Sequence, residues 1–287
     1  MKKIQTGFLV SYDYEKLKKS IPPVYEKSDE IFLALDYQNR TWTGTKFEIG
    51  EDFFTWIDTF DVDKKITVYR DDFYIPELSP IDNDSRERTL LSEKMGLGNW
   101  LVQVDADEIF LDFDNFVETL RKYDHFLDNP EKNKIQFSGF LINIYKYLDN
   151  GLLYVDDATK FMVATNYPNY KRARNTKERV IYVPHYALHE TLSRTEEELV
   201  FKISNWGHKD EINSEFFTKW KSANEKNYTQ LKDLFYLNPK IWKSLGYFPS
   251  ENLNDIKGFI KENPNLKKSK MWIFKKNFGQ WFKHLIK

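Results

Sequence analysis

The stretch Trp100-Leu101-Val102-Gln103-Val104-Asp105-Ala106-Asp107-Glu108 decides the fold. Its first five residues form a short apolar run, which is typical of a strand buried inside a parallel sheet. The run ends where the carboxylates begin, so the sequence places Asp105 and Asp107 at the carboxyl end of that strand. Paired carboxylates there suit a hard cation such as Mg²⁺ or Mn²⁺, because such ions take oxygen ligands and bridge to substrate phosphates.

Strands and helices alternate upstream of this stretch. The predicted strands cover residues 7–11, 31–35 and 65–69, and the predicted helices cover 14–25, 51–58 and 84–95. This order favours an α/β fold with a mixed, mostly parallel sheet and helices on both faces. Ligands of such sheets bind beyond the carboxyl ends of the strands. We therefore expect residues 11–13 and Asp36 to lie near Asp105.

The rest of the chain has a less regular pattern of strands and helices. A helix is predicted over 116–127, strands over 134–140, 151–155 and 199–204, a polar loop over 166–177, and lysine-rich helices beyond 213. The net charge of −1 predicts no nucleic-acid partner. With no cysteine, the chain has no thiol nucleophile, thiolate zinc site or disulfide. No signal peptide or membrane span is recognised, which predicts a cytoplasmic protein.

A calcium-binding loop of the EF-hand type is the nearest alternative for residues 105–116. That loop needs a glycine at its sixth position and a glutamate at its twelfth. The chain has Phe110 and Phe116 there, so the alternative fails. The other acidic clusters, at 61–63 and 71–72, flank a predicted strand and are expected to be solvated.

The segments at the strand ends resemble the nucleotide-binding half of glycosyltransferase family 2. The matching segments are residues 9–14, 31–36 and 100–110, and a looser likeness extends over about 5–215. The resemblance implies the GT-A fold, with a nucleotide-sugar-binding catalytic domain over 1–213 and a helical C-terminal extension over 214–287. In that family an Asp-x-Asp motif binds the metal, here Mn²⁺ or Mg²⁺, and the diphosphate of a nucleotide sugar.

The resemblance also assigns residues to the nucleotide and the metal. The expected nucleotide-binding residues are Ser11, Tyr12, Asp13, Asp36, Arg86, Arg88 and Asp105, and the expected metal ligands are Asp105, Asp107 and His208. A tyrosine ring would stack on the base while a carboxylate accepts its N–H groups. Alternatively, Arg86 and Arg88 form ion pairs with acidic neighbours, and His208 has a structural role.

The acceptor hydroxyl must lose a proton, which requires a base. The family supplies it from an acidic pair followed by an arginine, and the matching stretch here, residues 185–194, reads His-Glu in place of the pair. Glu190 is therefore the predicted base, with Asp156 and Asp157 in reserve. We expect His189 to be a further metal ligand, a contact for the acceptor or a hydrogen-bonded residue of the core. Basic residues of the polar loop, Lys171, Arg172, Arg174 and Lys177, either neutralise the departing diphosphate or are solvated.

Residues 271–287 predict a basic amphipathic helix. Its aromatic residues recur at spacings of three and four, with lysines opposite, so it either docks on the catalytic domain or lies on anionic lipid. In the second case the protein would be peripheral at the inner face of the membrane.

The expected function is metal-dependent transfer of a sugar from a nucleoside diphosphate sugar to an acceptor hydroxyl, with inversion. The acceptor is a glycan, or is linked to lipid or protein. One alternative is a sugar-phosphate nucleotidyltransferase, although that class carries a Gly-rich loop where this chain has Ser11-Tyr12-Asp13-Tyr14. The other alternative is a non-catalytic carbohydrate-binding protein.

Overall fold

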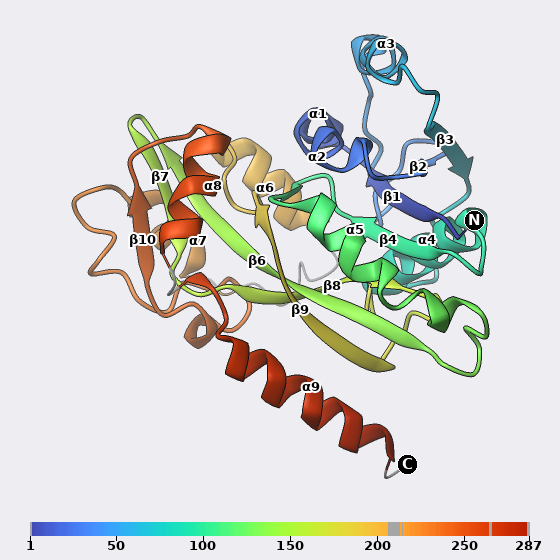
Figure 1. Cartoon of the computed structure of the whole chain (residues 1–287). Coiled ribbons are helices and arrows are strands. Elements are labelled where there is room, and N and C mark those ends of the chain that lie inside the picture. Colours follow the sequence, from blue (N-terminus) through green and yellow to red (C-terminus); the bar gives the residue numbers. More distant parts are fainter. Residues whose placement is uncertain (1, 206–212, 214, 264–265, 286–287) are drawn as a thin grey trace.

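The computed structural model describes residues 2–205, 213, 215–263 and 266–285 (Figure 1). The strands are β1 (Ile4–Val10), β2 (Glu30–Asp36), β3 (Ile66–Asp71), β4 (Trp100–Val104), β5 (Glu108–Phe110), β6 (Ile135–Leu148), β7 (Gly151–Val155), β8 (Thr159–Thr165), β9 (Arg179–His189) and β10 (Leu245–Phe248). The α-helices are α1 (Leu17–Ser20), α2 (Pro22–Tyr25), α3 (Glu51–Phe60), α4 (Pro80–Met95), α5 (Phe113–Arg121), α6 (Glu196–Asn205), α7 (Phe216–Ser222), α8 (Leu253–Glu262) and α9 (Lys270–Leu285). Short 3₁₀ turns are η1 (Tyr14–Lys16), η2 (Asp124–Leu127) and η4 (Pro239–Ile241).

The strands form one mixed sheet in the order β10-β7-β6-β8-β4-β1-β2-β3, with β9 pairing β5 and β6. The N-terminal strands β3, β2, β1 and β4 are parallel, whereas β8, β6, β7 and β10 pair antiparallel. The predicted α/β fold with a mixed sheet and C-terminal helices is therefore confirmed. Because β1, β2 and β4 run the same way, their carboxyl ends meet at one edge of the sheet.

Helices cover both faces of the parallel half, as predicted. Successive side chains of a strand point to opposite faces. On one face, Leu9, Ala34 and Leu101 pack with Leu91 and Met95 of α4. Gly7 lets α4 approach β1, because a Cβ there would lie 2.8 Å from Leu91 Cδ2.

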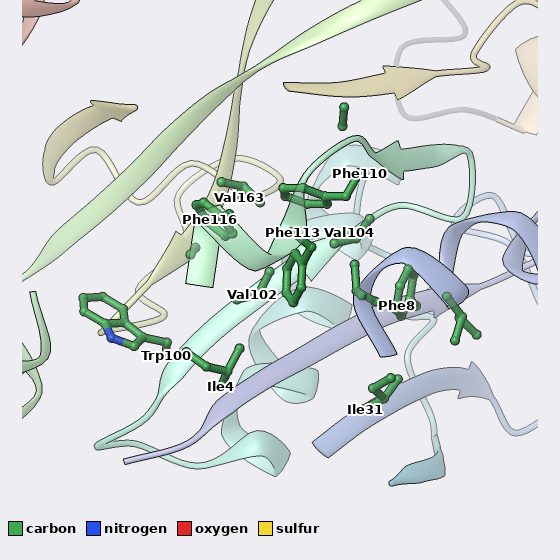
Figure 2. Close-up of a cluster of buried hydrophobic side chains, with 14 of the residues drawn as sticks. Ile4, Phe8, Ile31, Trp100, Val102, Val104, Phe110, Phe113, Phe116 and Val163 are labelled. Carbon is green, nitrogen blue, oxygen red and sulfur yellow. The ribbon is translucent and has the colours of Figure 1, made fainter. Parts of the chain in front are cut away.

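The opposite face carries the larger core, and it includes residues of α1, α2, α3 and α5. Figure 2 shows part of it, with Phe8 of β1, Val102 and Val104 of β4 and the rings of Phe113 and Phe116 in one cluster. Strands β1, β2 and β4 are thus buried on both sides, which holds their carboxyl ends in fixed relative positions.

Several predicted elements differ from the structure. The single helix predicted over 14–25 is η1, α1 and α2, the helix predicted over 116–127 is α5 followed by η2, and the strand predicted over 134–140 is the longer β6. The differences at α4 and α6 have clear physical reasons. Helix α4 begins at Pro80 and not at residue 84, since the hydroxyl of Ser79 accepts the Asp82 N–H as a cap. The segment 199–204, predicted as a strand, lies inside helix α6. Thr195 and Glu198 start that helix by exchanging side-chain and backbone hydrogen bonds, which is the capping-box arrangement.

The C-terminal region contributes both to the sheet and to its cover. Strand β10 pairs with β7, and α9 lies along β9 (Figure 1). The domain boundary at 213 remains a prediction. No helix in the described ranges is long and apolar enough to cross a membrane.

Candidate functional site

A cavity of about 180 Å³ lies beyond the carboxyl ends of β1 and β4. Charged side chains of both signs line it, namely Asp13, Asp105, Asp107, Glu108, Arg88, Arg174 and Lys202. Its wall also includes the predicted Tyr12. Pockets for small molecules usually exceed about 300 Å³, so a nucleotide could enter only if some of these side chains moved.

Two arginines hold Asp105. Arg88 Nη2 lies 2.9 Å from Asp105 Oδ1, and Arg174 Nη2 lies 3.5 Å from Asp105 Oδ2. Burial raises the pKa of Asp105, but the positive charges of Arg174 and Arg88 outweigh burial and hold the pKa below its usual value. Arg174 also donates two hydrogen bonds to the buried carboxylate of Glu108, at 2.7 and 2.6 Å. The Asp105 side chain, which is 31% exposed, is therefore an anion kept charged by its neighbours.

Asp107 is held by a second basic pair. Lys202 Nζ lies 2.6 Å and Arg194 Nη2 2.9 Å from Asp107 Oδ2, while His189 Nε2 lies 3.6 Å from Oδ1. Burial raises the pKa of Asp107, yet Lys202, His189 and Arg194 together bring it well below its usual value. Arg194 also reaches Asp13 at 2.7 Å. This arginine therefore joins the loop after β1 to the loop after β4.

The described residues offer an incomplete set of metal ligands. Asp105 and Asp107 each already face two cationic side chains. Among the described residues, no group of three or more His, Cys, Asp or Glu side chains is arranged to hold an ion. The third predicted ligand, His208, lies outside the described residues. This donor set does not fit a divalent ion by itself, so Mn²⁺ or Mg²⁺ remains a prediction.

Asp36 lies beside the cavity without lining it. Its carboxylate accepts two hydrogen bonds from the Arg40 guanidinium, at 2.8 and 2.9 Å, and others from the backbone N–H groups of Gln38 and Phe73. Burial raises the pKa of Asp36, but the hydrogen bonds from Arg40 and from the backbone outweigh burial. The pKa of Asp36 therefore lies below its usual value. These bonds fix the turn after β2, and that turn carries Thr41 and Trp42 to the cavity wall.

The predicted nucleotide residues therefore separate into two groups. Tyr12, Asp13, Arg88 and Asp105 line the cavity. Ser11, Asp36 and Arg86 do not. Arg86 donates to the backbone carbonyl of Phe73, at 2.9 Å, on the outer side of α4.

Glu190, the predicted base, is buried behind the cavity wall. Its carboxylate accepts from Lys16 and from the Tyr147 hydroxyl, both at 2.6 Å, and from Lys19 at 3.2 Å. Burial raises the pKa of Glu190, but Lys16, Tyr147 and Lys19 lower it overall. The neighbouring His189 does line the cavity, and its Nδ1 lies 2.8 Å from the Asn143 amide oxygen. The reserve carboxylates at 156 and 157 do not line the cavity.

Helix α6 supplies site residues that the sequence did not reveal. Lys202 and Asn205 lie one turn apart on α6 and both line the cavity. Asn205 Oδ1 accepts hydrogen bonds from the hydroxyls of Thr41 and Thr43, at 3.2 and 2.8 Å. The chain after β2 and helix α6 thus meet at the cavity wall. The misassigned strand hid this face, because a strand would have placed residues 202 and 205 on opposite sides.

No protein-family model matches the sequence, and no curated protein matches it significantly. Among solved structures, the fold is similar to two crystal structures of S. aureus TarS. One covers TarS 1–349, with a TM-score of 0.28 and 10% identity over 52% of this chain and 37% of that chain. The other has a TM-score of 0.27 and 11% identity over 52% of this chain and 23% of that chain. The chain therefore spans well under half of either one, and so weak a likeness carries no argument about function.

Proposed function

We propose that this chain is a glycosyltransferase that moves a sugar from a nucleoside diphosphate sugar to an acceptor hydroxyl, with inversion. One observation carries the proposal, namely the convergence of Arg88, Arg174 and Lys202 with Asp105 and Asp107 in one cavity at the carboxyl edge of the sheet. Guanidinium and ammonium groups are the side chains that bind phosphate oxygens. A diphosphate would bind in the cavity beside these cations.

The charge pattern suits departure of a diphosphate. Negative charge builds on the leaving group as the bond to the sugar breaks, and fixed cations in a buried site stabilise that charge strongly. Arg88 is 3% exposed, and its contacts with Asp84 and Asp105 hold it in one orientation. The cations are therefore in place before the donor binds.

Deprotonation of the acceptor is assigned to Glu190 or to its neighbour His189. Glu190 must first be released by Lys16 and Tyr147, whereas His189 Nε2 already faces the cavity. Comparing Glu190→Gln with His189→Gln separates the two, because the variant of the true base loses transfer to the acceptor while keeping donor binding. The acceptor is a glycan, free or attached to lipid or protein.

The experiment that tests the reaction uses Asp107→Asn with Asp63→Asn as its control. Asp63 is exposed and belongs to an acidic cluster far from the cavity. Release of UDP, GDP or dTDP is measured from a panel of sugar donors. We expect Asp107→Asn to lose at least about 100-fold in rate, because Asp107 holds Lys202 and Arg194 in place and the loss of a positioned cation weakens stabilisation of the leaving diphosphate. Full activity of a folded Asp107→Asn protein would contradict the proposal.

A further inference from the structure

Helix α9 is fixed on the fold by one of its faces. The Asn277 side chain donates to the carbonyl of Tyr182 at 2.9 Å and accepts from the N–H of Tyr182 at 2.7 Å. Gln280 accepts the N–H of Val180 at 3.3 Å. These amides meet backbone groups of β9, and Trp272 packs edge-on against Phe140 and Tyr182. The rotation of α9 about its own axis is therefore set.

The opposite face of α9 carries aromatic rings in solvent. Phe274, Phe278 and Phe282 follow one another at intervals of four residues, and Trp281 stands beside them. Their exposed fractions are 64%, 50%, 44% and 49% in that order, and Met271 is 61% exposed. Neighbouring rings on this face contact one another, with the centroids of Phe278 and Phe282 4.8 Å apart. A continuous exposed apolar strip of this kind marks an interaction surface.

The surroundings of this aromatic strip are basic. Residues 266–287 contain seven lysines and no acidic residue, in a chain whose net charge is only −1. A groove of about 680 Å³ at the start of α9 is lined by five lysines, of which Lys257 and Lys261 belong to α8, Lys267 and Lys268 precede α9, and Lys270 begins α9. On α9 itself, Lys275 and Lys276 are exposed. Lys275 follows Phe274 directly, whereas Lys276 Nζ lies 5.4 Å from the ring centre of Trp272 on the docked face. Apolar rings beside concentrated positive charge complement an anionic lipid surface.

We propose that α9 and the lysines around it bind the surface of an anionic lipid bilayer. The rings of residues 274, 278, 281 and 282 enter the interface, while the lysines contact the headgroups. Helix α9 lies in the membrane plane, since no described helix could span the bilayer. Strand β9 joins this surface to the candidate site, because α9 docks at Val180 and Tyr182 and the strand ends at His189.

Sedimentation with lipid vesicles tests the proposal without any assay of activity. The full chain is mixed with vesicles of phosphatidylcholine alone, or of phosphatidylcholine with about one third phosphatidylglycerol. The test protein carries Phe274→Ser, Phe278→Ser and Trp281→Ser together. The control carries Val62→Ser and Leu97→Ser, which remove exposed apolar side chains away from α9. Thermal unfolding checks that each protein is folded.

We expect the wild type and the control to bind the anionic vesicles at least about tenfold more tightly than the neutral vesicles. The triple variant should lose at least about tenfold in binding to the anionic vesicles. Equal binding of wild type and triple variant, or equal binding to both vesicles, overturns the proposal.

The alternative partner for the aromatic strip is a second copy of the chain. Light scattering after size-exclusion chromatography distinguishes it. A two-chain mass for the wild type that falls to one chain in the triple variant would assign the strip to self-association and overturn the lipid proposal. Because neither readout involves the sugar donor, failure here leaves the proposed reaction untouched.

Discussion

The cavity beyond β1 and β4 buries charge, whereas α9 exposes aromatic rings. Asp107 and Arg88 are 5% and 3% exposed, while Phe274 is 64% exposed. Both arrangements run against the usual distribution of side chains. Neither arrangement is explained by the stability of the fold. Buried ion pairs often stabilise a protein no more than apolar packing would, and exposed rings contribute no free energy of burial. The two regions are therefore the places where ligands are expected, an anionic nucleotide at one and a lipid surface at the other.

The largest expected effect on stability comes from removing a buried cation. Arg174→Ala would remove the two hydrogen bonds that Arg174 donates to the fully buried Glu108, which would keep the one from the Asp105 N–H. We expect a loss of about 4 kcal/mol in the free energy of unfolding, measured with urea. Lys171→Ala in the same loop removes an exposed charge and should cost less than about 0.5 kcal/mol. Similar small losses in both variants would show that the ionic network is not structural.

A smaller effect is expected from Glu87, on α4 beside Arg88. Burial raises the pKa of Glu87 to about 8, although the Trp42 N–H bonded to it at 2.7 Å opposes the rise. The folded protein therefore keeps Glu87 protonated at neutral pH, while the unfolded chain ionises it near its ordinary value of 4.5. The bound proton contributes its full stability when the pH is below the pKa of Glu87 in the unfolded chain. This contribution is lost as the pH rises through the pKa of Glu87 in the folded protein.

The corresponding test is Glu87→Gln, which mimics the protonated acid. Between about pH 5 and pH 8 the wild type should lose on the order of 3 kcal/mol more stability than Glu87→Gln. Glu93→Gln, an exposed position on the same helix, should follow the wild type. Parallel pH curves for wild type and Glu87→Gln would contradict the raised pKa.

The smallest effect is expected on the outer face of α9. Phe278→Ser should change the free energy of unfolding by less than about 0.5 kcal/mol, because its ring is half exposed and lies on the undocked face. Trp272→Ser on the docked face should cost about 2 kcal/mol or more, since that ring packs on Phe140 and Tyr182. A large loss for Phe278→Ser would mean that the aromatic strip serves the fold.

The parallel half of the fold was predictable because its signals are local. Each apolar run ends in a polar residue, and the chain order of runs and helices fixes where their carboxyl ends meet. The Asp105 and Asp107 pair followed from that order alone. Helix α6 was missed because its apolar residues read as a strand, although Thr195 and Glu198 carried the signal of a helix start.

The partners of the acidic pair could not be predicted in the same way. Lys202 and Arg194 lie 95 and 87 residues beyond Asp107 in the sequence. Only tertiary packing brings them together, and no spacing rule links them. The same limit applies to α9. Its amphipathic pattern allowed either docking or lipid contact, and the docked face became clear only when Asn277 was found on the edge of β9.

The most direct test of the nucleotide site is calorimetric titration of the whole chain with UDP, GDP and dTDP, with Mn²⁺ and with a chelator in its place. We predict that at least one of these nucleotides binds, and that Arg88→Ala weakens its binding at least about tenfold. Binding only with Mn²⁺ would support the predicted metal at Asp105 and Asp107, whereas equal binding with chelator would assign the diphosphate to the basic side chains. No binding of any of the three nucleotides under either condition would contradict the account.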